Sequence, residues 1–284
     1  MLEFNNVSIG YKKKKIISSI ELSIAPGIHA IIGPNGVGKT TFMKAIVTLI
    51  EPFSGTISYN GVDVKDLDRH FLSIIGYLPQ EFEPFSDLNG KDYLKYIAEC
   101  KGLAKKESNE QIDSLLKLVG LDEHNKKKAG KYSLGMKRRL GLAQALLGNP
   151  EILVLDEPTA GMDPDEVRTI RRMLSNYSKE RIVFISTHII SDIDAIANNI
   201  IAIKNGKIVL NSPPNVLCDE IQGMVFSVRS KTERLPEGLI EVSRKTSGDD
   251  YQYRYIDPSG KGILFGSECC DPNISDYYAW FYYE

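Results

Sequence analysis

The sequence has few cysteines. Its 284 residues include four of them, Cys100, Cys218, Cys269 and Cys270. Their spacing does not provide the paired ligands of a metal site, and their number is too low for the disulfide framework of a secreted domain. The composition therefore favours a reducing compartment.

Long apolar stretches are also missing. No run approaches the roughly 18 to 20 apolar residues that a membrane-spanning helix needs. The start of the chain, Met1 to Phe4, lacks the basic and apolar regions of a signal peptide. We therefore expect any role at a membrane to depend on a partner protein.

Neither sign of charge is in large excess. The formal net charge is −2, so there is no electrostatic argument for nucleic acid, and we expect no nucleic-acid partner. Two short lysine runs, 12–15 and 126–128, could bind phosphate or acidic lipid, although runs of this length usually form solvated loops.

The sequence does have the pattern of an α/β protein. Its length allows one large domain and a smaller appendage, and 42% hydrophobic residues suit a compact core. Apolar patterns predict two N-terminal antiparallel strands followed by buried strands. The predicted strands cover 2–9, 16–24, 28–32, 74–78, 152–155, 182–186 and 200–203. Because the later strands alternate with helical patterns, we expect a mostly parallel sheet with ligands at the carboxyl ends of its strands.

Two changes of pattern suggest the domain organisation. Helical periodicity replaces strand signals after residue 81, which predicts a helical subdomain inserted at about 81–150. After Pro213 and Pro214 the pattern becomes short and strand-like around Val225, Ile240, Tyr253 and Ile263. We therefore predict a large α/β domain at 1–214 and a small α+β appendage at 215–284. No internal repeat is visible, which indicates a single copy of any site in the large domain.

A phosphate-binding motif lies between the predicted strand 28–32 and a helical stretch that begins near Thr40. Its residues are Gly33, Pro34, Asn35, Gly36, Val37, Gly38, Lys39, Thr40 and Thr41, which fit G-x-x-x-x-G-K-S/T. Glycines let main-chain N–H groups approach phosphate oxygens, and the helix N-terminus adds the positive end of its dipole. We expect Lys39 to bind the β- and γ-phosphates of ATP and Thr40 to bind Mg²⁺. The alternative is a glycine-rich structural turn.

Two adjacent acids end the predicted strand 152–155. Burying Asp156 and Glu157 together would be costly unless they serve a purpose. Asp156 suits the Walker B acid that binds Mg²⁺ directly or through water, and Glu157 suits the general base for an attacking water. The alternative is a solvated acid pair at the end of a strand.

These two motifs define only a broad class of P-loop NTPases, but further stretches resemble the ABC ATPase family over roughly residues 1–210. Tyr11 follows the first strand, where the family stacks an aromatic ring on adenine. Gln80 follows strand 74–78 and resembles the glutamine that connects Mg²⁺ with the helical subdomain. Taken singly, Tyr11 could be a packing residue and Gln80 a surface residue.

Residues 132–136, Tyr-Ser-Leu-Gly-Met, stand where the family has its Leu-Ser-Gly-Gly-Gln signature. In the family this helix start faces the ATP of the other subunit, and Ser133 and Gly135 keep the hydroxyl and main-chain N–H groups that contact the γ-phosphate. Leu134 and Met136 depart from the pattern. This variant resembles the bacterial ABC-2 type and bacteriocin or antibiotic exporters, while the alternative is an ordinary serine-capped helix.

Two further positions complete the resemblance. Asp163, in 160–163, is similar to the acid of the loop that crosses between subunits, and His188 is similar to the switch histidine that contacts the γ-phosphate. The other histidines, His29, His70 and His124, are expected to be core or capping residues.

The resemblance implies a nucleotide site shared between two chains, and hence an ATP-sandwich dimer. Because this chain carries both halves, a homodimer is sufficient, although a heterodimer is compatible. The family implies an ATPase that drives a separately encoded integral membrane permease from the cytoplasmic face of the membrane. Residues 272–277 also resemble the C-terminal ending of many ABC-2 type ATPases, with Ser275 in place of the usual acid.

Two other functional classes are compatible with the motifs. A soluble ABC ATPase acting on ribosomes, DNA or cofactor assembly would need fused nucleotide domains or a long coiled coil in its best-known forms, and this sequence has neither. A binding or immunity module would use ATP to gate a dimer, and the intact Glu157 argues against it. The transported substrate cannot be read from the sequence.

Overall fold

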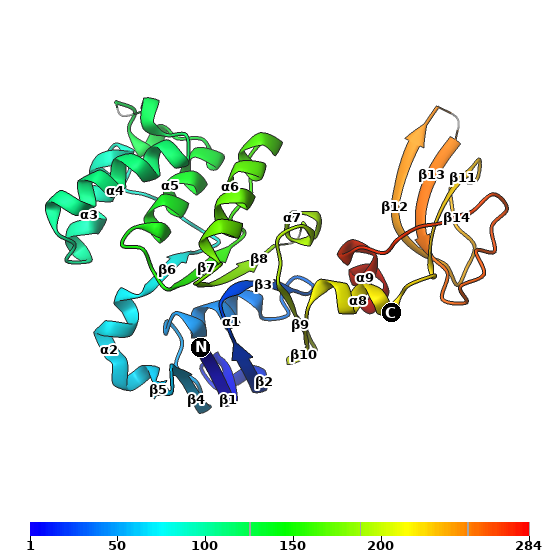
Figure 1. Cartoon of the computed structure of the whole chain (residues 1–284), viewed down its shortest axis with the longest axis horizontal. Coiled ribbons are helices and arrows are strands. Elements are labelled where there is room, and N and C mark those ends of the chain that lie inside the picture. Colours follow the sequence, from blue (N-terminus) through cyan, green and yellow to red (C-terminus); the bar gives the residue numbers. More distant parts are fainter. Residues whose placement is uncertain (125, 188, 249, 284) are drawn as a thin grey trace. The chain divides into compact units, whose positions relative to one another are not determined.

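The computed structural model describes residues 1–124, 126–187, 189–248 and 250–283 of the chain. It divides into two compact units (Figure 1). The first comprises Met1–His188 and Asn198–Asn211, and the second comprises Ile189–Ala197 and Ser212–Glu284. The sequence places a single boundary at 214/215, and it gives no sign that 189–197 pack with the C-terminal part.

A six-stranded sheet lies at the centre of the first unit, in the order β10-β9-β3-β8-β7-β6. Its strands are β3 (Gly27–Ile32), β6 (Ile75–Leu78), β7 (Ile152–Asp156), β8 (Ile182–Ser186), β9 (Asn199–Lys204) and β10 (Lys207–Ser212). β3 pairs in parallel with β8 and β9, and β7 with β6 and β8. Every residue of β3, β7 and β8 is buried, which explains their unbroken apolar runs. The predicted parallel sheet is confirmed.

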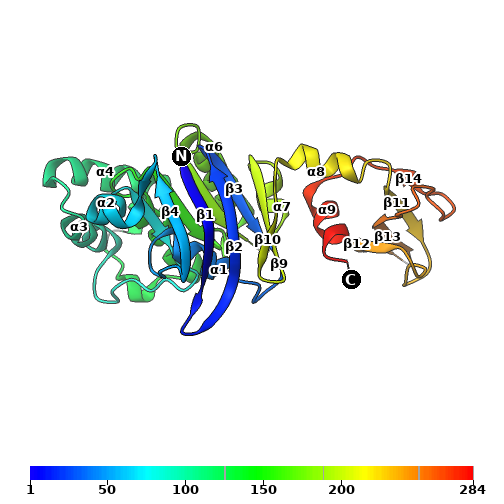
Figure 2. The same cartoon turned by 90° about the horizontal axis from the view of Figure 1, so that it is seen from below.

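A second, antiparallel sheet has the order β2-β1-β4-β5. It contains β1 (Leu2–Tyr11), β2 (Lys14–Ile24), β4 (Ser54–Tyr59) and β5 (Val62–Asp63), and Figure 2 shows β1 between β2 and β4. The core joins this sheet to α1 (Lys39–Ile46), because the rings of Phe4 and Phe42 lie 5.3 Å apart and Phe42 also packs against Phe184. β4, β5 and the following α2 (Val64–Ser73) are not among the predicted elements.

Helices fill the chain between β6 and β7, as the sequence predicts. They are α3 (Gly90–Cys100), α4 (Lys105–Leu118) and α5 (Leu134–Leu146), with short 3₁₀ turns at Asp122–His124 and Ala129–Lys131. The three α-helices pack against one another (Figure 1), and Leu94 of α3 and Ile112 and Leu116 of α4 are buried. α6 (Pro164–Tyr177) follows β7. Among the described residues, no helix is both long enough and apolar enough to cross a membrane.

The second unit is an α+β fold, as expected. It contains α7 (Ser191–Asp194), α8 (Pro214–Glu220), β11 (Val225–Ser230), β12 (Ile240–Ser247), β13 (Asp250–Ile256), β14 (Glu268–Cys269) and α9 (Ile274–Phe281). The strands form an antiparallel sheet in the order β12-β13-β11-β14. The predicted strand around Ile263 is wrong, because Ile263 lies in the loop between β13 and β14 and is 57% exposed.

Candidate functional site

The phosphate-binding motif forms the turn from β3 into α1. Gly36 has φ +80°, and a Cβ at this position would meet no atom within 4 Å, so the loop leaves open space there. Gly38 has φ +117°, and a Cβ there would lie 3.0 Å from Ile16 and 3.1 Å from Ile17 of β2. Only glycine suits both the left-handed backbone and the close approach at Gly38. The N-terminus of α1 therefore opens onto a loop shaped for close contact with an anion.

Lys39, the first residue of α1, turns its ammonium group back over this loop. Its Nζ donates to the carbonyl of Gly33 at 2.6 Å and to that of Pro34 at 3.0 Å. Burial lowers the pKa of Lys39, while the nearby charges of Glu157 and Asp156 raise it. A cation that is partly desolvated and bonded only to carbonyls in these contacts is available for a phosphate.

Asp156 ends β7 beside the start of α1. The hydroxyl of Thr40 donates to Asp156 Oδ2 at 2.8 Å, and the hydroxyl of Ser186, from the end of β8, makes a short bond to Asp156 Oδ1. Asp156 is 2% exposed, and these bonds offset the cost of burying its charge. Ser186 is a site residue that the sequence did not single out, because a serine at the end of an apolar strand has no distinctive signal.

Glu157 follows Asp156 with φ +56°, a left-handed backbone that few residues other than glycine adopt. Its N–H donates to the carbonyl of Ser186 at 3.0 Å. Glu157 and Gln80 line one pocket of about 280 Å³ with the phosphate loop. The lining residues are Asn35, Gly36, Gly38, Lys39, Thr40, Thr41, Gln80, Asp156 and Glu157. The structure therefore brings together both acids, the loop and the predicted glutamine.

Other predicted residues lie outside this pocket. Tyr11 ends β1 and is 45% exposed. Ser133 is the N-cap of α5 and its Oγ accepts from the N–H of Met136 at 3.2 Å, so within one chain it acts as the ordinary cap that the alternative describes. Asp163 caps α6 and forms a capping box with Glu166. His188 lies outside the described residues.

The start of α5 and the loop before α6 are in contact. A Cβ at Gly135 would lie 2.5 Å from the carbonyl oxygen of Gly161, so only glycine permits this approach. The exposed Leu134 side chain lies 3.3 Å from the position of a Cβ at Gly161. Ser133, Gly135 and Asp163 therefore belong to one surface region of the chain, separate from the pocket that the phosphate loop lines.

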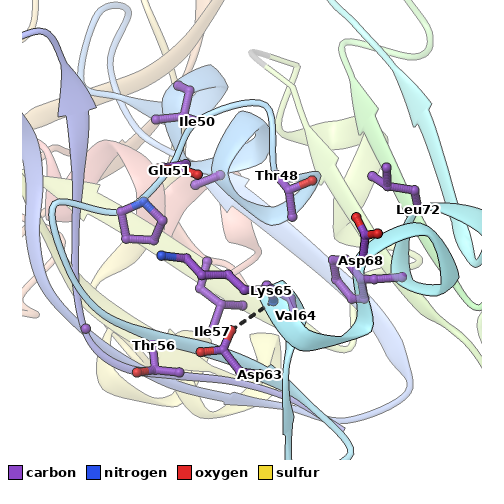
Figure 3. A pocket seen from close by; sticks show the side chains of 14 residues that line it. Thr48, Ile50, Glu51, Thr56, Ile57, Asp63, Val64, Lys65, Asp68 and Leu72 are labelled. Carbon is purple, nitrogen blue, oxygen red and sulfur yellow. Dashed lines mark hydrogen bonds between the residues drawn. The ribbon is translucent and has the colours of Figure 1, made fainter.

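A second pocket, of about 340 Å³, lies at the other end of α1 between β4 and α2 (Figure 3). The acids Glu51, Asp63 and Asp68 line it together with Lys65, and Asp63 accepts from the N–H of Lys65 at 2.9 Å. Three carboxylates and one ammonium group are unfavourable for a triphosphate. The chemistry for phosphate binding therefore lies at the N-terminal end of α1.

The pocket at the phosphate loop has the oxygen donors that suit Mg²⁺. This ion prefers oxygen ligands and often takes only one or two carboxylates together with substrate phosphates and water. The hydroxyl of Thr40 donates a hydrogen bond to Asp156, and Gln80, whose side chain has an amide oxygen, lines the same pocket. The described residues contain no cluster of three His, Cys, Asp or Glu side chains that would instead indicate a metal cage made by the protein alone.

This fold and site define a P-loop NTPase. The model of the ABC transporter family matches residues 17–160. An uncharacterized ABC transporter ATP-binding protein of Bacillus subtilis is 36% identical over 89% of this chain and 83% of its own length. A lantibiotic transport ATP-binding protein of Streptococcus pyogenes is 35% identical over 74% of this chain and 90% of its own length. A bacitracin transport ATP-binding protein of Bacillus licheniformis is 37% identical over 72% of this chain and 66% of its own length.

Solved structures give the same result. An ATP-binding subunit of an ABC transporter superposes with a TM-score of 0.71 at 26% identity, covering 78% of this chain and 92% of that one. A dimeric ATP-binding cassette in a post-hydrolysis state with ADP and Pi superposes with a TM-score of 0.68 at 25% identity. The match covers 75% of this chain and 98% of that one. The chain belongs to the ABC transporter family, in which it is an ATP-binding and ATP-hydrolysing subunit. The predicted resemblance and enzymatic class are thus confirmed, and the soluble-machine alternative is not favoured.

Proposed function

We propose that two copies of this chain hydrolyse Mg-ATP to power export through a separate membrane permease. The observation that carries the proposal is the bond between Thr40 and Asp156, in one pocket with Glu157, Gln80 and Lys39. It joins the start of the phosphate-loop helix to the strand end that presents the two acids. A triphosphate bound at the loop would have its terminal phosphate beside them.

Each residue of the pocket has a role in this scheme. Lys39 would leave the carbonyls of Gly33 and Pro34 to bind the β- and γ-phosphates, and the loop N–H groups would bind the other oxygens. Thr40, Asp156 and Gln80 would hold Mg²⁺, which when bound supplies positive charge against the phosphate oxygens. Glu157 would accept a proton from the attacking water, and its fixed backbone keeps the carboxylate at the end of β7.

The remaining predicted residues would act on the nucleotide of the other copy. Ser133 and Gly135 at the start of α5 would contact the γ-phosphate, and His188 of the nucleotide's own chain would contact it as well. The Ser133 hydroxyl accepts from Met136 and still has its own proton to donate. Asp163 would cross between the copies, and Tyr11 would stack on adenine. Separation of this surface region from the pocket supports a two-fold assembly.

A surface for the permease lies just after Gln80. Phe85 is 53% exposed and packs edge-on against Tyr96, with ring centroids 5.3 Å apart. Phe82 and Phe85 also contact Tyr93. An exposed aromatic cluster beside a nucleotide-facing loop suits the docking of a helix from the permease. The chain would then act at the cytoplasmic face of the membrane.

The names of the relatives suggest the cargo. Proteins similar to this chain are described as transporting bacitracin and lantibiotics, so we propose export of a peptide antibiotic or a similar amphiphile. The chain should be expressed in a sensitive host together with its proposed permease partner. We expect a higher inhibitory concentration of bacitracin or of a lantibiotic, and no protection with Glu157→Gln. Protection that persists in Glu157→Gln would contradict export driven by hydrolysis.

A further inference from the structure

One buried cation of α5 has no part in the scheme so far. Arg138 is 5% exposed, and its guanidinium group donates to two consecutive main-chain carbonyls of the loop after β6. Its Nη1 lies 2.6 Å from the carbonyl oxygen of Pro79, and its Nη2 makes a short bond to that of Gln80. The planar, forked geometry of arginine allows both bonds at once.

The burial of the Arg138 charge is unfavourable, which suggests that its contacts have a function. Burying a charge costs free energy unless strong partners compensate, and both of these bonds go to carbonyls that carry only partial charges. Desolvation lowers the pKa of Arg138, whereas the charges of Asp156 and Glu157 raise it. The cation is thus fixed to the backbone of Gln80, which lines the same pocket as the two site acids.

Neighbouring contacts of α5 bring the same loop close. A Cβ at Gly141 would lie 2.6 Å from Leu78 and 2.9 Å from Phe82. Lys137 forms an exposed ion pair with Glu83 at 2.6 Å. Of these contacts, the bonds of Arg138 are the ones made to the main chain, one to Pro79 and one to Gln80. They come from the second turn of the helix that begins after Ser133.

We propose that Arg138 is a positioning residue for hydrolysis: it fixes the backbone of Gln80 to α5, so that the glutamine and the helix start at Ser133 and Gly135 move together. The proposal rests on the role given to Gln80 above. A displacement of α5 when Ser133 meets the partner's ATP would then place Gln80 at its own pocket. Loss of Arg138 would leave the phosphate loop intact but free the glutamine from the helix.

Two substitutions and a control test the idea. Arg138→Met keeps an unbranched side chain of similar length but removes both bonds. Lys101→Met is the matched control, because the half-buried Lys101 donates to the carbonyl of Leu147 at 2.7 Å, at the far end of α5. Gln80→Ala removes the side chain that Arg138 is proposed to position. Thermal melting and calorimetric ATP binding without Mg²⁺ would accompany steady-state ATPase measurements on every variant.

We expect Arg138→Met to lower kcat about ten- to hundredfold, in the range that small misplacements of catalytic groups cost, with ATP affinity unchanged. Lys101→Met should melt at a similarly reduced temperature but retain kcat within about twofold. Arg138→Lys, which can reach one carbonyl, should recover part of the rate. In a Gln80→Ala background, Arg138→Met should lower kcat by no more than about twofold, because both changes remove one function.

The outcomes separate the two proposals. If Gln80→Ala alone retains the wild-type kcat, the role assigned to Gln80 fails, and this inference fails with it. Suppose that Gln80→Ala lowers kcat, and that adding Arg138→Met to it lowers kcat again by the same factor as in the wild type. Arg138 then does not act through Gln80. Should Arg138→Met fail to fold, the same comparison can be made with Arg138→Lys. A kcat loss equal to that of Lys101→Met would reduce Arg138 to a packing residue.

Discussion

At the scale of single residues, Glu157 combines an unusual backbone with a chemical task. Its φ of +56° costs energy in a residue with a side chain, and strain of this kind often accompanies function. The N–H bond to Ser186 anchors the turn directly after Asp156. The carboxylate is therefore placed by the end of the strand and not by a flexible loop.

Glu157→Gln keeps the size of the side chain but removes the basic oxygen that would accept the proton. Steady-state ATP hydrolysis should fall by about 10² to 10⁴, the usual contribution of a general base. Lys39, Thr40 and Asp156 are unchanged, so Mg-ATP should still bind. Near-normal turnover in a coupled phosphate-release assay would exclude Glu157 as the base.

The same variant tests the shared site. Because ATP binds but is not cleaved, closed dimers of Glu157→Gln should accumulate and elute early in size-exclusion chromatography with Mg-ATP. Adding Ser133→Arg should abolish the dimer, since it crowds the start of α5 and places a misdirected charge there. A monomer in every condition would contradict the ATP-sandwich arrangement.

Lys39→Ala should abolish tight ATP binding. The substitution removes the point charge that faces the phosphates, while the glycine conformations of the loop stay the same. Lys44→Ala, on the same helix but outside the pocket, is the control and should bind ATP as the wild type does. Equal affinities of the two variants in calorimetry would remove Lys39 from the site.

His29 predicts a pH dependence of stability. It is a buried residue of β3, where its Nε2 is 2.8 Å from the carbonyl oxygen of Ala25, and burial lowers its pKa. The unfolded chain therefore binds a proton below about pH 6.5 that the folded chain resists, and stability falls as the pH drops. From about pH 7.5 to 5.5, the wild type should therefore lose more of its free energy of unfolding than His29→Gln does in urea unfolding. Parallel pH profiles would show that His29 is not responsible.

The residues with motif chemistry were predictable, and those that support them were not. Lys39 and Asp156 follow from the spacing of glycines and acids that phosphate binding requires. Ser186 and Arg138 gain their meaning only from tertiary contacts, because neither residue type nor local pattern shows which carboxylate or carbonyl they will meet. The expectation that His29 is a core residue is confirmed.

At the scale of elements, α9 depends on one buried ion pair. Asp276 is fully buried, and it accepts from Nε and Nη2 of Arg254 on β13 while closing the capping box with Asn273. Both bonds measure 2.7 Å. The hydrogen bond to Asp276 raises the pKa of Arg254. Removing Arg254 would take away both side-chain bonds that compensate the buried charge of Asp276 and leave only the capping bond from Asn273.

Arg254→Met should therefore destabilise the second unit by about 3 to 5 kcal/mol. The chain has one tryptophan, Trp280, and it lies in α9, so its fluorescence in urea reports this unit. Arg244→Met is the control, because Arg244 makes an exposed pair with Glu241 at 3.9 Å, and it should lower the unfolding midpoint less than Arg254→Met does. Equal midpoints for the two variants would show that the buried pair does not stabilise α9.

The aromatic loop after Gln80 makes a separate prediction. Charged substitutions at both Phe82 and Phe85 should uncouple transport while the isolated subunit keeps its ATPase, because Phe85 is exposed and could contact a partner. Phe82 is half-buried and lies against α5, so the Phe85→Glu single variant is the cleaner test. If ATPase and transport fall together, the cluster is structural.

Elements with strong periodicity were predictable from the sequence, and irregular ones were not. Buried strands such as β7 and β8 are unbroken apolar runs, and the predicted 182–186 matches β8. The sequence pattern did not predict α2, because this helix is interrupted at Asp68, where φ is +44°. The strand expected around Ile263 failed because Gly260, Gly262 and Gly266 have positive φ and turn the chain away from an extended course.

At the scale of the whole molecule, activity should depend on protein concentration. If each pocket needs Ser133 and Gly135 of a second copy, the purified chain is monomeric without nucleotide, and ATPase rate rises faster than linearly with concentration. Rates should be measured across the range in which chromatography shows dimerisation. A strictly linear dependence of a protein that is monomeric without nucleotide would contradict the shared site.

The chain crosses between the two units three times. The peptide backbone passes from the first unit into the second after residue 188, returns after 197 and leaves again after 211. The second unit is therefore built from two separate segments of the chain, so deleting the C-terminal segment alone would not remove the whole unit. A stop codon after 211 would remove the C-terminal segment with which 189–197, including the buried Ile193, form the second unit. Recombination between exporters should accordingly exchange this unit only together with the nine residues that follow position 188.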